Sequence, residues 1–173
     1  NFKLFINGNL DATNTSYTTT NISPGGNQTL AIGNIVETNA TLEAEACFEG
    51  FISNLRVVKG TAIYSSSFTP PTAPTTDVTN TKLLANFTNA QMIDSTAKNN
   101  FETVGSVYLT STVKQFGTTS CDLYGSTGSM VASPPSPLYN ILNAGKFTVE
   151  FWIYVDNYHA AYSDIVGVFN GVS

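Results

Sequence analysis

Alternation of apolar and polar residues is the strongest pattern along this chain, and it predicts β-strands. Residues 147–155 alternate strictly and place five apolar side chains on one strand face: Phe147, Val149, Phe151, Ile153 and Val155. In residues 51–58, alternation predicts one face with Phe51, Leu55 and Val57 and another with Ile52, Asn54, Arg56 and Val58. Shorter apolar runs bounded by turn residues lie at 2–6, 30–32, 82–87 and 165–169. Because helical periodicity is scarce, the pattern predicts an all-β, antiparallel β-sandwich.

Two turn signals organise these strands. Asn7-Gly8 follows the first apolar run, and this dipeptide is the strongest short signal for a β-hairpin. Residues 68–81 are rich in Pro and Thr, a composition typical of a semi-rigid linker. We therefore divide the chain into residues 1–67, a linker at residues 68–81, and residues 82–173.

Composition and charge exclude several classes of partner. The chain has 173 residues, with 7 Lys and Arg against 12 Asp and Glu, and a net charge of -5. Binding to nucleic acid needs clustered basic residues, so we expect no nucleic-acid partner. The acidic balance also disfavours docking on an anionic membrane, and no apolar run is long enough for a membrane helix, so we expect no membrane insertion.

The two cysteines, Cys47 and Cys121, lie far apart in the sequence and match no metal-binding or redox spacing. A pair of buried free thiols is the interpretation that we favour, with a disulfide as the alternative.

Several motifs resemble a laminin-G-like domain of the concanavalin-A-like lectin and glucanase superfamily. The most specific is residues 147–154, Phe-Thr-Val-Glu-Phe-Trp-Ile-Tyr, which matches a strand in the first half of such domains. Residues 4–8 (Leu-Phe-Ile-Asn-Gly), 30–33 and 50–57 match three motifs of the second half. Such domains recur in tandem in tail-fibre and structural proteins of marine tailed phages. The resemblance implies a jelly-roll sandwich.

The order of these motifs implies that the chain spans two consecutive domains. Residues 1–67 resemble the C-terminal half of one domain and residues 82–173 the N-terminal half of the next. We therefore expect a segment of a longer polypeptide whose halves belong to different sandwiches. The alternative is a circularly permuted fold in which the two halves pair with each other.

Asp94, Asn99 and Asn100 form the one candidate metal site, because carboxylate and amide oxygens in a loop are calcium ligands. The other interpretation is an Asx-turn, in which Asp94 caps its own backbone. We favour the turn and expect no cofactor, with Ca²⁺ as the alternative.

An aromatic cluster near one strand end is the candidate glycan-binding site, since exposed aromatic rings stack on sugar faces. It comprises Tyr154, Tyr158 and Tyr162. Trp152 lies beside them, and for this side chain we favour packing in the core over ligand contact.

Catalytic candidates are weak. Glu43 and Glu45 alternate as in glucanases of the superfamily, but the third alternate position is Cys47 rather than an acid. His159 is the only histidine and has no visible partners for a triad. We expect no enzymatic activity.

The resemblance thus implies a structural or adhesion module of a tandem-repeat virion fibre or extracellular appendage. Its expected partners are neighbouring repeats or copies of the same protein, with weak binding of host-surface glycans. The expected location is a virion, a cell surface or the extracellular space. The alternatives are a calcium-assisted carbohydrate-binding lectin domain and a repeat of a bacterial surface adhesin or filament.

Overall fold

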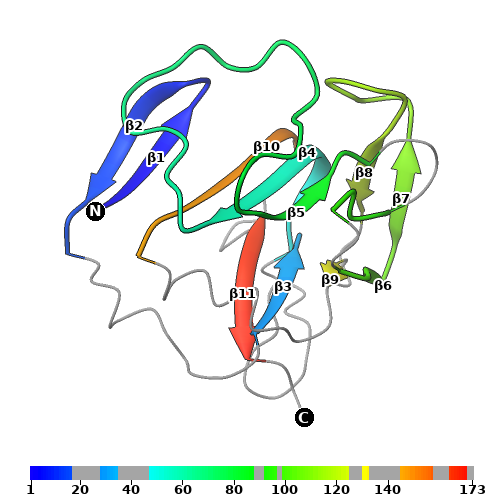
Figure 1. Ribbon diagram of the computed structural model, residues 1–173. Coiled ribbons are helices and arrows are strands. Elements are labelled where there is room, and N and C mark those ends of the chain that lie inside the picture. The colour runs from blue at the N-terminus through cyan, green and yellow to red at the C-terminus, as the bar shows by residue number, and fades with distance from the viewer. Residues whose placement is uncertain are drawn as a thin grey trace.

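A computed structural model describes eight ranges of the chain: residues 1–16, 28–34, 47–87, 92–96, 99–124, 130–132, 145–157 and 164–170. These residues form eleven β-strands and contain no helix (Figure 1). All paired strands run antiparallel. The prediction of an all-β fold with antiparallel sheets is confirmed.

The strands form three sheets. A two-stranded sheet pairs β1 (Phe2–Ile6) with β2 (Asn9–Asn14). A five-stranded sheet has the order β10 (Phe147–Asn157), β4 (Glu49–Lys59), β8 (Ser120–Leu123) and β7 (Val107–Thr110), and β5 (Thr81–Ala85) also pairs with β4. A four-stranded sheet has the order β11 (Val166–Asn170), β3 (Gln28–Ile32), β9 (Met130–Ala132) and β6 (Glu102–Val104).

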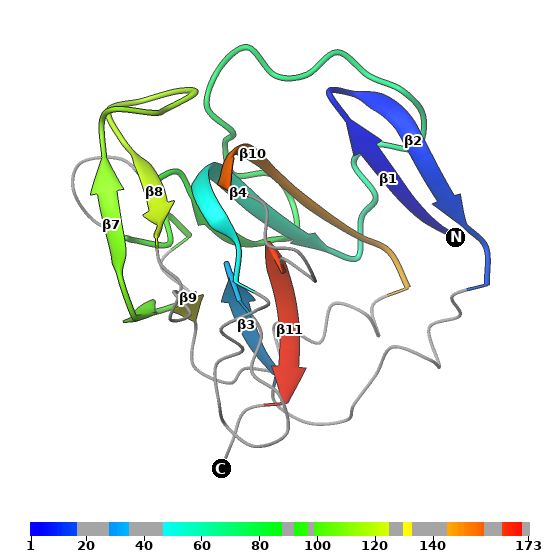
Figure 2. The ribbon, with the colours of Figure 1, turned by 180° about the vertical axis from the view of Figure 1, so that it is seen from behind.

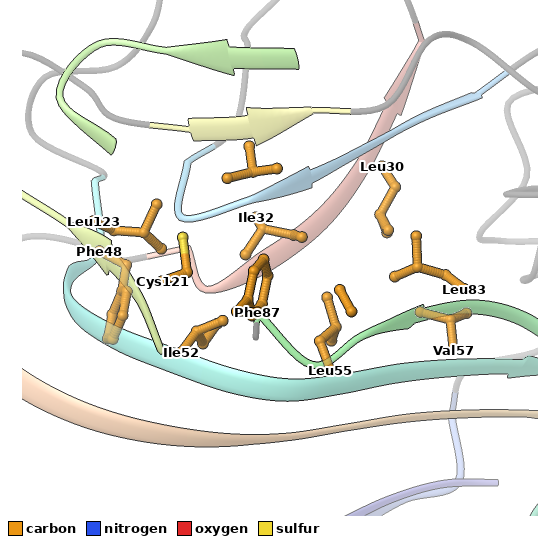
Figure 3. Close-up of a cluster of buried hydrophobic side chains, with 12 residues drawn as sticks. Leu30, Ile32, Phe48, Ile52, Leu55, Val57, Leu83, Phe87, Cys121 and Leu123 are labelled. Carbon is orange, nitrogen blue, oxygen red and sulfur yellow. The ribbon is translucent and has the colours of Figure 1, made fainter. Parts of the chain in front are cut away.

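The hydrophobic core lies between the two larger sheets, as in a β-sandwich. Figure 3 shows Leu30 and Ile32 of β3 facing Ile52 and Leu55 of β4. These four side chains are almost completely inaccessible to solvent. Burial of apolar side chains from both sheets supplies the main stabilisation of such a fold.

Both cysteines are buried and form no disulfide, which confirms the favoured interpretation. Cys121 belongs to the core between the sheets (Figure 3). Burial, and secondarily the charge of Asp122, raises the pKa of the Cys121 thiol far above its ordinary value. Because the thiolate is the reactive form, this side chain acts as a small hydrophobic residue.

Strands from both halves of the chain complete the same two sheets. β4 pairs with β10 from Lys59 opposite Phe147 to Glu49 opposite Asn157, and β3 pairs with β11. Within this chain the two halves therefore pair with each other, whereas the order of the sequence motifs led us to expect separate sandwiches. β4 of the first half and β10 of the second half are hydrogen-bonded neighbours, so no strand is missing between them when the two halves pair with each other. The domain boundaries in a longer polypeptide stay a prediction.

The Pro/Thr segment is an arm bound to the five-stranded sheet. We define the arm as residues 61–80, which run from β4 to β5 and arch beside the hairpin of β1 and β2 (Figure 2). The Arg56 guanidinium donates to the Thr76 carbonyl at 2.7 Å, and the Phe68 amide donates to the Gly8 carbonyl at 2.9 Å. Thr75 is buried and its hydroxyl donates to the Asn54 carbonyl at 3.3 Å. These bonds fix a segment whose composition is typical of a linker.

A β-bulge changes the faces predicted for residues 51–58. In the pairing of β4 with β10, Ser53 lies opposite Trp152 and Arg56 opposite Glu150, so Asn54 and Leu55 together face one residue. Asn54 has a left-handed backbone with φ of 55°. Ile52 before the bulge and Leu55 after it both point into the core, while Phe51 before it and Arg56 after it point outward. The predicted grouping of Phe51 with Leu55 is wrong, because alternation fails where the strand has one extra residue.

The hairpin and the arm predict a measurable role for Gly8. Gly8 and Gly145 both have left-handed backbones, with φ of 77° and 74°. A Cβ at Gly8 would lie 2.0 Å from the Phe68 carbonyl oxygen, whereas a Cβ at Gly145 would meet nothing within 4 Å. Gly145→Ala should therefore cost only the backbone strain, about 1 kcal/mol, and Gly8→Ala should cost clearly more. Urea unfolding measures both, and equal losses would mean that the arm does not pack on the hairpin.

Candidate functional site

The outward face of the five-stranded sheet has a groove lined by aromatic side chains. We define the outer face as the one opposite the core. Alternation with the core residues Ile52, Cys121 and Val155 assigns Phe51, Asp122 and Tyr154 to this face. The groove holds about 160 Å³ of space and is lined by Phe51, Ile52, Ser53, Val113, Lys114, Gln115, Ser120, Trp152, Ile153 and Tyr154. This is below the roughly 300–1,000 Å³ of pockets that enclose a drug-sized ligand, so the groove suits a shallow contact.

Ring contacts fix the aromatic walls of this groove. The Phe51 and Tyr154 rings lie 5.9 Å apart on neighbouring strands. Trp152 packs edge-to-face against Phe116 at 5.7 Å, so the loop between β7 and β8 holds the indole in place. Tyr154 is 55% exposed. Rings that are held rigidly and left exposed bind a partner at little entropic cost.

Serine, lysine and glutamine supply the polar groups of the groove. Ser53 of β4 and Ser120 of β8 line it but are almost completely buried, and the Ser120 hydroxyl donates to the Val113 carbonyl. Lys114 and Gln115 come from the loop after β7 and are exposed. An apolar surface with a few polar groups at its edge can stack on a sugar ring and also donate hydrogen bonds to its hydroxyls.

A buried ion pair closes the other end of the outer face. Arg56 of β4 binds Glu150 of β10 through two guanidinium nitrogens, and the Tyr64 hydroxyl donates to the second Glu150 oxygen at 3.0 Å. Tyr64 stacks on Phe68 with ring centroids 3.5 Å apart. Burial, and next the Glu150 charge, raises the pKa of Tyr64. The cluster of Arg56, Glu150, Tyr64 and Phe68 thus holds the arm against this end of the outer face. The aromatic groove lies at the end that the arm does not cover.

Asp122 lies on the outer face beside the groove. It is directly opposite Phe51 on one side and Tyr108 on the other. Burial, followed by the charges of Asp156 and Glu49, raises the pKa of the Asp122 carboxyl above 3.8. Three carboxylates therefore give this part of the face a negative potential.

The structure brings only part of the predicted glycan-binding cluster into the groove. Tyr154 lines it, while Tyr158 and Tyr162 lie outside the described residues. Trp152 also lines the groove: it is partly buried, packs against Phe116 of the loop between β7 and β8, and is not a member of the core cluster between the sheets. Glu43, Glu45 and His159 likewise lie outside the described residues.

Sequence reasoning missed Phe51, Tyr108 and Asp122 as members of this face. They lie on three different strands, and only the strand order places them side by side. The sequence pattern that could have placed them on the outer face is their alternation with core residues: Asp122, for example, lies between Cys121 and Leu123.

Asp94 acts as a buried turn cap. It is 1% exposed, and one carboxylate oxygen accepts the Leu84 amide at 2.9 Å and the Thr96 amide at 3.0 Å. The other oxygen accepts the Thr96 hydroxyl at 2.7 Å and the Asn99 amide nitrogen at 2.5 Å. This arrangement is an Asx-turn that ties the loop to β5.

The same donor set does not fit a calcium ion. Asn99 presents its NH₂ group to Asp94, and the orientation is fixed because this group also donates to the Lys82 carbonyl at 2.8 Å. Asn100 is exposed. Calcium needs oxygen ligands, whereas the carboxylate oxygens here face hydrogen-bond donors. Across the described ranges, no group of three or more His, Cys, Asp or Glu side chains could hold a metal ion.

Comparison of the chain with family models, with curated proteins and with solved structures finds no match in any of the three. The laminin-G-like resemblance therefore stays a prediction. No helix among the described residues is long and apolar enough to cross a membrane.

The raised pKa of Asp122 predicts a stability cost that depends on pH. The folded state binds the proton of the Asp122 carboxyl more tightly than the unfolded state does. The contribution of Asp122 to the free energy of unfolding is therefore greatest below 3.8, the pKa in the unfolded state, and is lost as the pH rises through the folded-state pKa. Asp122→Asn should therefore be more stable than the native protein at neutral pH, and the gain should shrink as the pH falls from the folded pKa towards 3.8 and be absent below it. Urea unfolding at several pH values measures this. Asp11→Asn in β2 is the control, and a pH-independent gain in Asp122→Asn would contradict the assignment.

The turn-cap role of Asp94 predicts two separate results. Asp94→Ala should lower the free energy of unfolding by about 3 kcal/mol, because buried amide donors lose their acceptor, and Asp94→Asn should lose less because it keeps one oxygen. Excess chelator should leave the Tm of the native protein unchanged. A lower Tm in chelator would reveal a bound ion, since such an ion stabilises only the folded state.

Proposed function

We propose that this chain is a non-enzymatic adhesion module that binds glycans weakly through the aromatic groove. The observation that supports this most directly is the pair Trp152 and Tyr154 in the groove of the outer face, with Tyr154 exposed and with the exposed Lys114 and Gln115 side chains beside it. Rigid aromatic surfaces flanked by polar groups stack on the apolar faces of sugar rings. The shallow shape of the groove fits low affinity for a single site.

We further propose that the module is a laminin-G-like jelly roll within a tandem array on a virion fibre or a similar extracellular appendage. The sequence motifs support this reading, and so does a composition in which Thr, Asn and Ser exceed charged residues. Arraying weak sites raises the overall affinity through effective concentration, without new contacts at any one site. Neighbouring repeats are the expected partners.

The absence of hydrolysis is part of the proposal. Glycosidases place two carboxylic groups on either side of the scissile bond. None of the residues that line the groove is acidic: Asp122 lies beside the lining, and Glu150 on the same face is engaged by Arg56 and Tyr64. A bound sugar would therefore meet aromatic, hydroxyl and amide groups in the groove rather than an acid and base pair.

Binding to a glycan array tests the adhesion function. The full chain, displayed multivalently on fluorescent streptavidin, should bind a subset of glycans, and Trp152→Ala and Tyr154→Ala should each weaken binding about tenfold, as expected for loss of one stacking contact. Leu4→Ala changes an exposed apolar residue in the separate hairpin and is the matched control. Binding that survives both aromatic substitutions, or no binding to any glycan, would refute this function.

A further inference from the structure

A line of side chains crosses the outer face at right angles to the strands. Tyr154 on β10 lies opposite Phe51 on β4, Phe51 lies opposite Asp122 on β8, and Asp122 lies opposite Tyr108 on β7. Directly paired residues share one face of a sheet, so these four side chains form a continuous row. We call it the cross-strand row.

The two ends of this row are open to solvent. Tyr154 is 55% exposed and Tyr108 is 57% exposed, while Phe51 and Asp122 between them are partly buried. Three steps between neighbouring strands separate the ends, a span of about 14 Å. This span is longer than a single sugar ring and comparable with a short oligosaccharide. Exposed aromatic rings at both ends, with a carboxylate between them, form an extended surface for several sugar units.

The charge of this surface selects the ligand class. Asp122 lies in the row, and the charges of Asp156 and Glu49 act on it. The basic residue of the groove, Lys114, comes from the loop between β7 and β8. Carboxylates accept hydrogen bonds from sugar hydroxyls and repel anionic sugars. The row therefore complements an uncharged, hydroxyl-rich chain and disfavours uronate or sialylated chains.

We infer that the cross-strand row is an extended subsite that binds a linear, neutral oligosaccharide across the strands, from Trp152 and Tyr154 at one end to Tyr108 at the other. This inference rests on the proposed glycan-binding function and adds the ligand class, its length and its direction. Trp152 and Tyr154 bind the first sugar unit, Asp122 accepts hydrogen bonds from the middle of the chain, and Tyr108 stacks on a distal unit.

Titration calorimetry with neutral oligosaccharides of graded length tests the extended subsite. The probes are gluco-, manno- and N-acetylglucosamine oligosaccharides, from the monosaccharide to the hexasaccharide, with polyuronate oligosaccharides as the charged counterparts. In the neutral series that binds, affinity should rise about tenfold or more between the disaccharide and the tetrasaccharide and then level off. Polyuronates of equal length should bind more weakly.

Substitutions at the two ends of the row separate their contributions. Tyr108→Ala should remove most of the gain from chain length and leave disaccharide affinity unchanged, whereas Trp152→Ala should weaken binding at every length. Asp122→Asn should reduce the discrimination against polyuronates. Tyr108 is exposed, so its substitution should leave the fold intact, and circular dichroism checks this.

The outcomes distinguish this inference from the function on which it rests. Trp152-dependent binding that is complete at the disaccharide, or an equal effect of Tyr108→Ala at all lengths, would overturn the extended subsite and leave the adhesion function standing. Tighter binding of polyuronates would overturn the ligand class. The absence of binding to every probe and to the glycan array would refute both.

Discussion

The fold depends on β4 and on its pairing along both edges. This eleven-residue strand pairs with β10 on one edge and with β5 and β8 on the other. One set of its side chains, Ile52, Leu55 and Val57, enters the core. The other set includes Phe51 in the groove and Arg56 in the ion pair. Loss of β4 would therefore remove the core, the junction between the two halves and the candidate site together.

The bulge in β4 separates two regions of the outer face. On one side of Asn54 the face is open and aromatic, and on the other side the arm covers it through Arg56, Thr75 and Tyr64. The bulge has a cost, because Asn54 combines a left-handed backbone with a buried Oδ1 atom that has no hydrogen-bond partner. Strained and unsatisfied groups persist where surrounding contacts hold them, and here the long ladder with β10 supplies those contacts.

The arrangement of the halves also explains why the candidate site spans the chain. Phe51 comes from the first half, and Trp152, Tyr154 and Tyr108 come from the second. The groove therefore forms only when β4 and β10 pair.

The sequence by itself determined the strands and the turns, since these depend on local contacts. Strict alternation located residues 147–155, and Asn7-Gly8 located a hairpin whose Asn7 and Gly8 have φ of 51° and 77°. It also identified Asp94 as a turn cap and Tyr154 as an exposed aromatic residue. Each of these properties follows from side-chain period or from short-range hydrogen bonding.

Tertiary structure alone decided how these elements combine. Strand order placed Tyr154, Phe51, Asp122 and Tyr108 in one row, and no local pattern links four separate strands. The bulge at Asn54 moved Phe51 away from Leu55, because the shift arises from pairing with β10 and not from the sequence of β4 alone. Burial of Thr75 and the bonds of Arg56 turned a linker-like segment into an ordered arm. Pairing between distant segments depends on the free energy of the whole core, which local periodicity does not contain.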